Sequence, residues 1–238
     1  MTEPLNIDHL RQRARRRLPR VVFDYIEGGA EDEVTLRENR AVFERIALRP
    51  RILAGGEIDS SAELFGRRLS VPIVVAPTGL NGLLWEKGDS CLARAAAKTG
   101  AGFALSTGSN MTLEEIAARA DGPNWLRGGM PRMENLAAFL PEGATAEDMA
   151  TFSRAQRNPG FGWEDLERIR GFWKGPLILK GVLTAADTRR AREAGCDGVI
   201  VSNHGGRQLD GAVATAHALP EVADAARRFT TTDDVPGM

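Results

Sequence analysis

The feature that most limits the fold of this chain is a set of strand-length apolar runs that alternate with segments of helical periodicity. The runs occur at residues 71–77, 102–107, 176–182 and 198–202, and all but the second contain at least three valine, isoleucine or leucine residues. Strands that are apolar on both faces belong to parallel sheets covered by helices. The alternation therefore predicts an α/β fold made of β-α units.

Helices are expected between these strands. Two of them begin at a capping box, in which a threonine and an acidic residue three positions later satisfy backbone N–H groups at the helix start. The boxes are Thr112 with Glu115 and Thr184 with Asp187. A further helix is expected at 89–99, because its helical pattern ends at a glycine.

The first seventy residues carry a different pattern. Amphipathic segments at 7–17, 21–27 and 31–44 predict three helices that precede the first strand. In the third helix the expected apolar contacts are Val34, Leu36, Val42 and Phe43. These helices form an extension to the region of strands that follows.

The patterns divide the chain into a helical extension at 1–70, a strand-and-helix region at 71–228 and a tail at 229–238, with an irregular loop at 128–162. Two parallel architectures compete for the second region, an open doubly wound sheet and a (β/α)8 barrel. A dinucleotide-binding sheet would show G-x-G-x-x-G directly after a strand, and no predicted strand is followed by it. Polar residues follow the strand ends instead, as in barrel active sites, which favours the barrel.

One strand end collects groups suited to proton abstraction from a hydroxy acid. The strand at 198–202 leads into the sequence NHGG, which contains His204 and is followed by Arg207. Imidazole is the usual general base near neutral pH, and the guanidinium fork fits a carboxylate. A base beside a carboxylate clamp is the arrangement that a 2-hydroxy acid requires.

Lys180 ends the apolar run PLILK at another strand end. Three interpretations are open: a lysine whose stem lies along the strand end, a Schiff-base lysine of an aldolase, or a fixed cation beside a reduced flavin. Small polar groups and free backbone at Pro77, Thr78, Gly79 and Ser106 occupy the ends of the first two strands. Their joint placement favours a planar heterocycle as ligand.

Composition excludes several classes of function. The net charge of −1 gives no global attraction to nucleic acid, and the arginine-rich stretch at 11–20 is typical of a solvated helix face. Cys91 and Cys196 lie apart, so neither a metal site nor a redox dithiol is expected. Two lone thiols, no apolar run of transmembrane length and no secretory signal favour a cytoplasmic protein.

Five longer segments are specific enough to compare with known families. They are VVFDYIEGGAEDE at 21–33, APTGLNG at 76–82, ALSTGSNM at 104–111, LILKGV at 177–182 and IVSNHGGRQLD at 200–210. Together they resemble the FMN-dependent α-hydroxy-acid dehydrogenases, the glycolate oxidase, lactate oxidase and mandelate dehydrogenase group, with TGLNG closest to the mandelate dehydrogenase type. The resemblance implies FMN as cofactor and a small 2-hydroxy acid as substrate.

The resemblance also implies a role for each residue at the strand ends. Tyr25 would hydrogen-bond the substrate, His204 would take its proton, and Arg207 would hold its carboxylate. The residues that would contact the flavin are Pro77, Thr78, Gly79, Ser106, Lys180 and Ser202. Lys180 would lie beside N1 and O2 of the ring and balance the charge of its reduced form.

The chain departs from the family pattern in several places. Strands 1, 2, 5 and 6 are recognisable, with a stub of strand 3 at 124–127 that leads directly into GGMPR. Strands 4, 7 and 8 and the segments that bind the FMN phosphate have no match, so we expect an incomplete barrel with poor FMN affinity. A complete chain would be a homo-oligomer, and a peripheral membrane or electron-acceptor contact is left open.

Three functions follow from these patterns. The chain is an FMN-dependent (S)-2-hydroxy-acid dehydrogenase or oxidase, a non-catalytic remnant that binds flavin or a partner, or a lysine-dependent aldolase. The aldolase gives no role to IVSNHGGRQLD. The residues specify neither which hydroxy acid is oxidised nor which acceptor takes the electrons.

Overall fold

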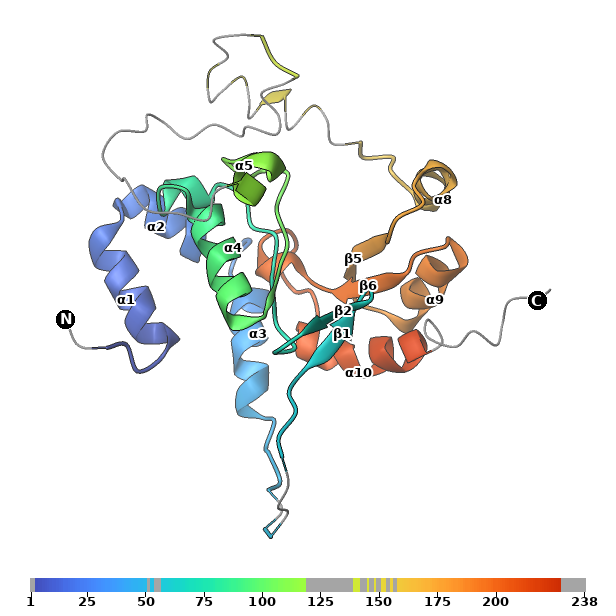
Figure 1. Cartoon of the computed structure of the whole chain (residues 1–238), viewed down its shortest axis with the longest axis horizontal. Coiled ribbons are helices and arrows are strands. Elements are labelled where there is room, and N and C mark those ends of the chain that lie inside the picture. The colour runs from blue at the N-terminus through green and yellow to red at the C-terminus, as the bar shows by residue number, and fades with distance from the viewer. Residues whose placement is uncertain are drawn as a thin grey trace. The chain divides into compact units, whose positions relative to one another are not determined.

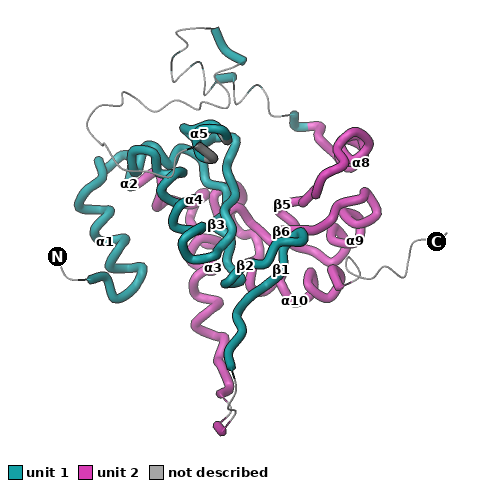
Figure 2. Tube along the Cα trace, in the orientation of Figure 1, with its two compact units in different colours: residues 1–23, 55–159 teal, residues 24–54, 160–238 magenta. Residues whose placement is uncertain are grey.

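A computed structural model describes residues 3–50, 52–53, 57–118 and 158–227, together with a few short stretches between 139 and 155. The chain forms two compact units (Figure 2). Unit 1 comprises Met1–Phe23 and Gly55–Pro159, and unit 2 comprises Asp24–Ala54 and Gly160–Met238. Among the described residues, each unit contains one pair of parallel strands.

Unit 1 is built around a β-α-β element. Strand β3 (Val74–Val75) lies parallel to β4 (Gly102–Phe103), and α4 (Gly88–Thr99) lies between them in the chain. A Cβ at position 102 would lie 2.9 Å from a Val74 methyl, so glycine allows this close pairing. The other elements are α1 (Ile7–Arg17), β1 (Ala62–Leu64), β2 (Arg67–Leu69), η1 (Asn81–Leu83) and α5 (Leu113–Ala118).

Unit 2 holds a longer parallel pair, β5 (Ile178–Val182) and β6 (Gly198–Val201), with α9 (Ala185–Glu193) between them in the chain. Helix α10 (Thr215–Ala226) packs against α9 and β6 (Figure 1). The unit also contains α3 (Val34–Glu44), α8 (Trp163–Phe172) and η2 (His204–Gly206). Helix α2 (Arg20–Glu27) begins in unit 1 and ends in unit 2.

Alternation along β5 and β6 separates a core face from an open face. Leu177, Leu179 and Val199 pack against a buried cluster on and after α8 and α9. The members of that cluster are Leu166, Ala191, Ala194 and Cys196. Neighbouring positions point the other way, as strand geometry requires, and Ile178 and Ile200 are 37% and 41% exposed. Lys180 belongs to this open face.

Most of the predicted helices are confirmed. Helices α1 and α4 follow the expected ranges closely, and α4 ends at Gly100 with a φ of 69°. At α5 the predicted capping box is present: the Thr112 N–H donates to the Glu115 carboxylate over 3.0 Å, and the Glu115 N–H donates to Thr112 Oγ1 over 3.2 Å. At α9 the Thr184 hydroxyl caps the Asp187 N–H over 3.0 Å.

The strand predictions were too long in unit 1. The expected strands at 71–77 and 102–107 shrink to β3 and β4, because only two residue pairs are in register there. An antiparallel hairpin of β1 and β2 was missed. Its two-residue turn, Phe65-Gly66, has positive φ at both positions, as in the primed turns that favour hairpins. Helices α8 and α10 were also not predicted, and α10 contains Pro220.

The third N-terminal helix begins later than expected, at Val34, because Glu31 and Glu33 adopt positive φ. Its contacts were partly mispredicted. Val42 is buried, but Val34 and Phe43 are 50% and 63% exposed. Thr35, which was not among the expected contacts, is fully buried, and its hydrogen bonds are described with the functional site.

The stub at 124–127 and the tail at 229–238 lie outside the described residues, as does most of the loop at 128–162. Within the described part of the chain, no helix has the length and apolar character needed to cross a membrane.

Candidate functional site

The carboxyl ends of β5 and β6 bring two predicted residues together. The Lys180 ammonium donates to Ser202 Oγ over 3.0 Å, and the His204 backbone N–H donates to the same oxygen, also over 3.0 Å. Ser202 continues the strand pairing, because its N–H donates to the Val182 carbonyl. One hydroxyl therefore connects the cation of β5 to the histidine that follows β6.

His204 lies in an unusual backbone turn. The φ angles of His204, Gly205 and Gly206 are 57°, 70° and 72°, so three consecutive residues are left-handed. Glycine adopts this region freely, whereas a residue with a Cβ does so only under strain. Asn203 closes the turn, because its Oδ1 accepts from the Gly206 N–H over 3.2 Å.

The surroundings of the His204 ring favour its neutral form. Partial burial lowers the pKa of His204 below its ordinary value, and the positive charges of Lys180 and Arg207 lower that pKa further. Among the described residues, none donates to or accepts from the imidazole nitrogens. A neutral ring with an accessible nitrogen can accept a substrate proton.

Arg207 is held against the end of α2. Its Nη1 donates to the carbonyls of Ile26 and Gly28 over 2.8 and 2.9 Å, and its Nη2 donates to that of Tyr25 over 2.7 Å. The guanidinium also lies 5.2 Å from the centroid of the Tyr25 ring, a cation–π distance. Three of its five N–H donors are thus used, which leaves two for a carboxylate.

Asp210, quoted above only as part of a motif, fixes the loop after β6. Its carboxylate accepts from the Val34 and Thr35 N–H groups over 3.0 and 2.7 Å at the start of α3. The pKa of Asp210 is lowered, chiefly by the Thr35 N–H bond. The buried Thr35 hydroxyl donates to the Ala212 carbonyl over 3.1 Å. No local pattern could reveal a cap whose helix lies 175 residues earlier.

In unit 1 the turn after β3 lies against the turn after β4. The Leu80 N–H donates to the Gly108 carbonyl over 2.8 Å, and the Gly108 N–H donates to Ser106 Oγ over 3.1 Å. A Cβ at Gly79 would lie 3.4 Å from the Gly108 oxygen. The predicted residues 77–79 and Ser106 are therefore brought together.

A buried network that sequence reasoning missed holds Thr78. Its hydroxyl donates to Asn81 Oδ1 over 3.0 Å, and Asn81 Nδ2 donates to the Thr78 carbonyl and to Asp89. Ser109 donates to the other Asp89 oxygen over 2.6 Å. Asp89 is 2% exposed in the first turn of α4, where the helix dipole favours negative charge.

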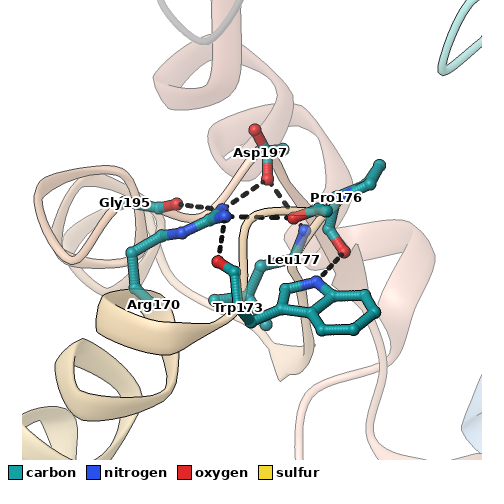
Figure 3. Close-up of polar contacts among 7 residues, drawn as sticks. Arg170, Trp173, Pro176, Leu177, Gly195 and Asp197 are labelled. Atoms are coloured by element: carbon teal, nitrogen blue, oxygen red, sulfur yellow. Dashed lines mark hydrogen bonds and ion pairs between the residues drawn. The ribbon is translucent and has the colours of Figure 1, made fainter.

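The amino ends of β5 and β6 carry a different polar cluster (Figure 3). Arg170 on α8 donates to the Asp197 carboxylate over 2.9 Å and to the carbonyls of Trp173 and Gly175. Asp197 also accepts from the Leu177 N–H over 2.8 Å. Both charges are paired within unit 2, so this cluster joins α8 to the starts of the two strands.

Comparison with known proteins connects these features. A model of the FMN-dependent dehydrogenase family matches residues 14–146 and 131–234. The L-lactate dehydrogenase of Pectobacterium atrosepticum is 35% identical over 289 residues, covering 91% of this chain and 75% of that protein. The chain belongs to the FMN-dependent dehydrogenase family. The (S)-mandelate dehydrogenase of Pseudomonas putida is 33% identical over 287 residues, covering 91% of this chain and 72% of that protein.

Solved structures agree. A monotopic membrane protein, (S)-mandelate dehydrogenase, matches with a TM-score of 0.86 and 32% identity, over 94% of this chain and 79% of that one. Mandelate oxidase matches with a TM-score of 0.77 and 33% identity, over 94% and 76%. The expected incomplete (β/α)8 barrel is confirmed, because the parallel strands of the described residues form two pairs and no closed ring.

The comparisons also place the missing segments inside the family pattern. The alignment with the lactate dehydrogenase is 289 residues long, more than the 238 residues of this chain. That relative therefore has internal residues without a counterpart here. The family model likewise matches in two segments that overlap at 131–146.

The residues present fit FMN, the cofactor of this FMN-dependent dehydrogenase family. In unit 2, Lys180 and Ser202 offer a cation and a hydroxyl of the kind that the polar edge of a flavin ring accepts. In unit 1, Thr78 and Gly79 are exposed and present backbone, and a side chain at position 79 would meet Gly108.

Proposed function

We propose that this dehydrogenase-family chain oxidises an (S)-2-hydroxy acid to the 2-oxo acid with FMN, and that His204 is the general base. The observation that carries the proposal is the junction at Ser202, where Lys180 and the His204 backbone meet at adjacent strand ends. Oxidation of 2-hydroxy acids is the chemistry of the lactate and mandelate dehydrogenases that the chain resembles.

The proposed steps use the chain's own groups. His204 takes a proton from the substrate, and its lowered pKa keeps the ring neutral and ready at pH 7. The two remaining N–H donors of Arg207 hold the substrate carboxylate, and Tyr25 donates its hydroxyl to the same molecule. The chemistry that bound FMN would supply is acceptance of the hydride equivalent that leaves the substrate carbon. Lys180 would help to hold the cofactor and would supply fixed positive charge to balance its reduced form.

The roles of the other flavin contacts, Pro77, Thr78, Gly79, Ser106 and Ser202, belong to the same proposal. The backbone of the 77–79 turn would face the ring, and the two serine hydroxyls would donate to its polar edge. Thr78 is held for this task by the network through Asn81.

A second function is a non-catalytic flavin-binding remnant. It is favoured by the internal residues of the lactate dehydrogenase that have no counterpart here. Because segments of the family pattern are missing, we expect poor FMN affinity. An aldolase with Lys180 as Schiff base would instead be trapped covalently by borohydride with a carbonyl substrate.

We further propose that the protein works in the cytoplasm, free or at a membrane surface, and that a complete enzyme is a homo-oligomer. The membrane alternative is supported by the structural relative that is a monotopic membrane protein. Sedimentation of the purified chain with and without lipid vesicles distinguishes the two locations.

The test of function is a titration of the purified chain with FMN, followed by anaerobic addition of mandelate or lactate. Quenching of flavin fluorescence together with bleaching of the yellow colour supports the dehydrogenase. Quenching without bleaching by a range of 2-hydroxy acids supports the remnant. Absence of both contradicts the two proposals.

A further inference from the structure

The side chain of Asn203, the residue before His204, uses its full hydrogen-bonding capacity. It is 8% exposed. Its Oδ1 accepts from the Gly206 N–H and from Asn39 Nδ2 over 3.0 Å. Its Nδ2 donates to Asn39 Oδ1 over 2.7 Å and to the Val213 carbonyl over 3.0 Å. An amide has two donors and two acceptor lone pairs, and all four are paired here.

Two of those four bonds go to Asn39, on α3. The two amides face each other in a reciprocal pair, each donating once and accepting once. The other two bonds stay within the segment that follows β6. Through Asn39, helix α3 therefore makes two hydrogen bonds to the residue next to the proposed base.

The left-handed turn that follows Asn203 needs hydrogen bonds of this kind to hold it. His204 has a Cβ and yet adopts a φ of 57°, a conformation that persists only where the surroundings impose it. The Gly206 carbonyl accepts from the Ala30 N–H over 2.8 Å, and a Cβ at Gly206 would lie 2.7 Å from the Leu36 nitrogen. Contacts from the α3 side thus hold both ends of the left-handed turn.

We propose that Asn39 is a positioning residue that holds His204 in its left-handed turn through the amide pair with Asn203. The proposal rests on the proposed function for what His204 does, but the geometry can be tested without turnover. A merely structural amide pair would stabilise the fold and leave the imidazole's surroundings unchanged when removed. Removal of a positioning pair changes the surroundings of the imidazole.

The groups that act on the imidazole define the readout. The ring is partly buried, and two charged groups act on it: the Lys180 ammonium from β5 and the Arg207 guanidinium from the loop that carries His204. All three lower the pKa of His204, and all three depend on where the ring is held. If the turn relaxes, the pKa of His204 rises toward its ordinary value.

The experiment is an NMR titration of the full chain labelled with ¹⁵N-histidine. The chain has three histidines, His9, His204 and His217, which single substitutions assign. Asn39→Leu removes both bonds of the amide pair at similar volume and is expected to raise the pKa of His204 only. Asn39→Ala removes both bonds without introducing a charge, so its shift is expected in the same direction.

Thr35→Val is the matched control. It removes a buried hydrogen bond, to the Ala212 carbonyl, on the same helix. It is expected to lower stability and leave the titration of His204 unchanged. An unchanged His204 pKa in folded Asn39→Leu overturns the proposal, as does an equal shift in Thr35→Val. If Asn39→Leu does not fold, Asn39→Ala is read by the same two criteria.

Turnover gives a second readout. Where the chain bleaches FMN with substrate, Asn39→Leu is expected to lower kcat about 10-fold to 100-fold with little change in KM, as a misplaced base does. If the His204→Ala variant bleaches FMN at the normal rate, the proposed function is wrong, but the positioning role of Asn39 is not contradicted. The NMR titration then still decides whether Asn39 positions the ring.

Discussion

The two ends of the β5–β6 pair are both polar, but they use charge in opposite ways. At the amino ends, Arg170 and Asp197 neutralise each other and bind backbone groups of the strands they join. At the carboxyl ends, the Lys180 ammonium donates to a neutral hydroxyl, and a second cation, Arg207, lies in the following loop. Positive charge is therefore paired with a carboxylate at the amino ends, whereas at the carboxyl ends neither Lys180 nor Arg207 has a carboxylate partner among the described residues.

We propose that this difference separates a structural end from a chemical end on one pair of strands. Paired charges with saturated hydrogen bonds stabilise a fold, because leaving either member alone is costly. Excess positive charge beside a neutral imidazole suits an anionic substrate and a cofactor that gains negative charge. Barrel enzymes show the same division, with chemistry at the carboxyl ends of the strands.

Among the substitutions that test this difference between the strand ends, the largest effect on the rate of flavin bleaching is expected at His204. His204→Ala should lower the rate of flavin bleaching by mandelate or lactate by about 10²-fold to 10⁴-fold, the usual contribution of a general base. Because the imidazole has no hydrogen-bond partner among the described residues, the urea midpoint of unfolding should change little. Bleaching at the original rate would show that the base lies elsewhere.

A substitution at the amino ends of β5 and β6 should instead lower the stability of the fold and have little effect on flavin bleaching. Arg170→Met removes the ion pair and the bonds to three carbonyls, and the Arg170 side chain is 23% exposed. We expect a loss of about 2 kcal/mol in the free energy of unfolding, measured with urea. Arg168→Met is the control, because its ion pair with Asp165 is exposed on the arginine side and should contribute less than about 1 kcal/mol. Equal losses of unfolding free energy in the two variants would mean that the Arg170 cluster stabilises the fold no more than an exposed ion pair does.

The smallest effect is a shift in pH dependence. The Lys180 charge lowers the pKa of His204, so Lys180→Met should raise that pKa. The acid limb of the kcat/KM profile then moves to higher pH, because the ring becomes protonated earlier as pH falls. A matching rise in the NMR titration of His204 confirms the cause. An acid limb that moves down or stays in place contradicts the charge argument.

Local patterns predicted what local physics determines. The capping box at Thr112 and the helix end at Gly100 need only neighbouring residues, and both are present. At Thr184 half of the predicted box is present, because its hydroxyl caps the Asp187 N–H while the Asp187 carboxylate accepts from that same hydroxyl. The strand ends that carry Lys180 and His204 were also found, because buried strands leave a strong apolar signal. The family resemblance supplied FMN and the hydroxy-acid chemistry, which the comparisons confirm.

The parts that were missed depend on distant residues. Asn39 with Asn203, and Asp210 with the start of α3, are joined across 164 and 175 or more positions. Asp89 is buried among partners from two other turns. For the same reason Thr35 could not be distinguished from a surface threonine, since its partner is the Ala212 carbonyl.

These long-range bonds also set an order of events during synthesis. A chain emerging from the ribosome makes α3 early, but the groups that bind it, between Asn203 and Val213, come about 170 residues later, and contacts of such separation form slowly. The left-handed turn at His204 can be enforced only when both partners exist. Nascent chains shorter than this therefore lack the partners of α3 that hold the proposed base, so its geometry can arise only late in synthesis.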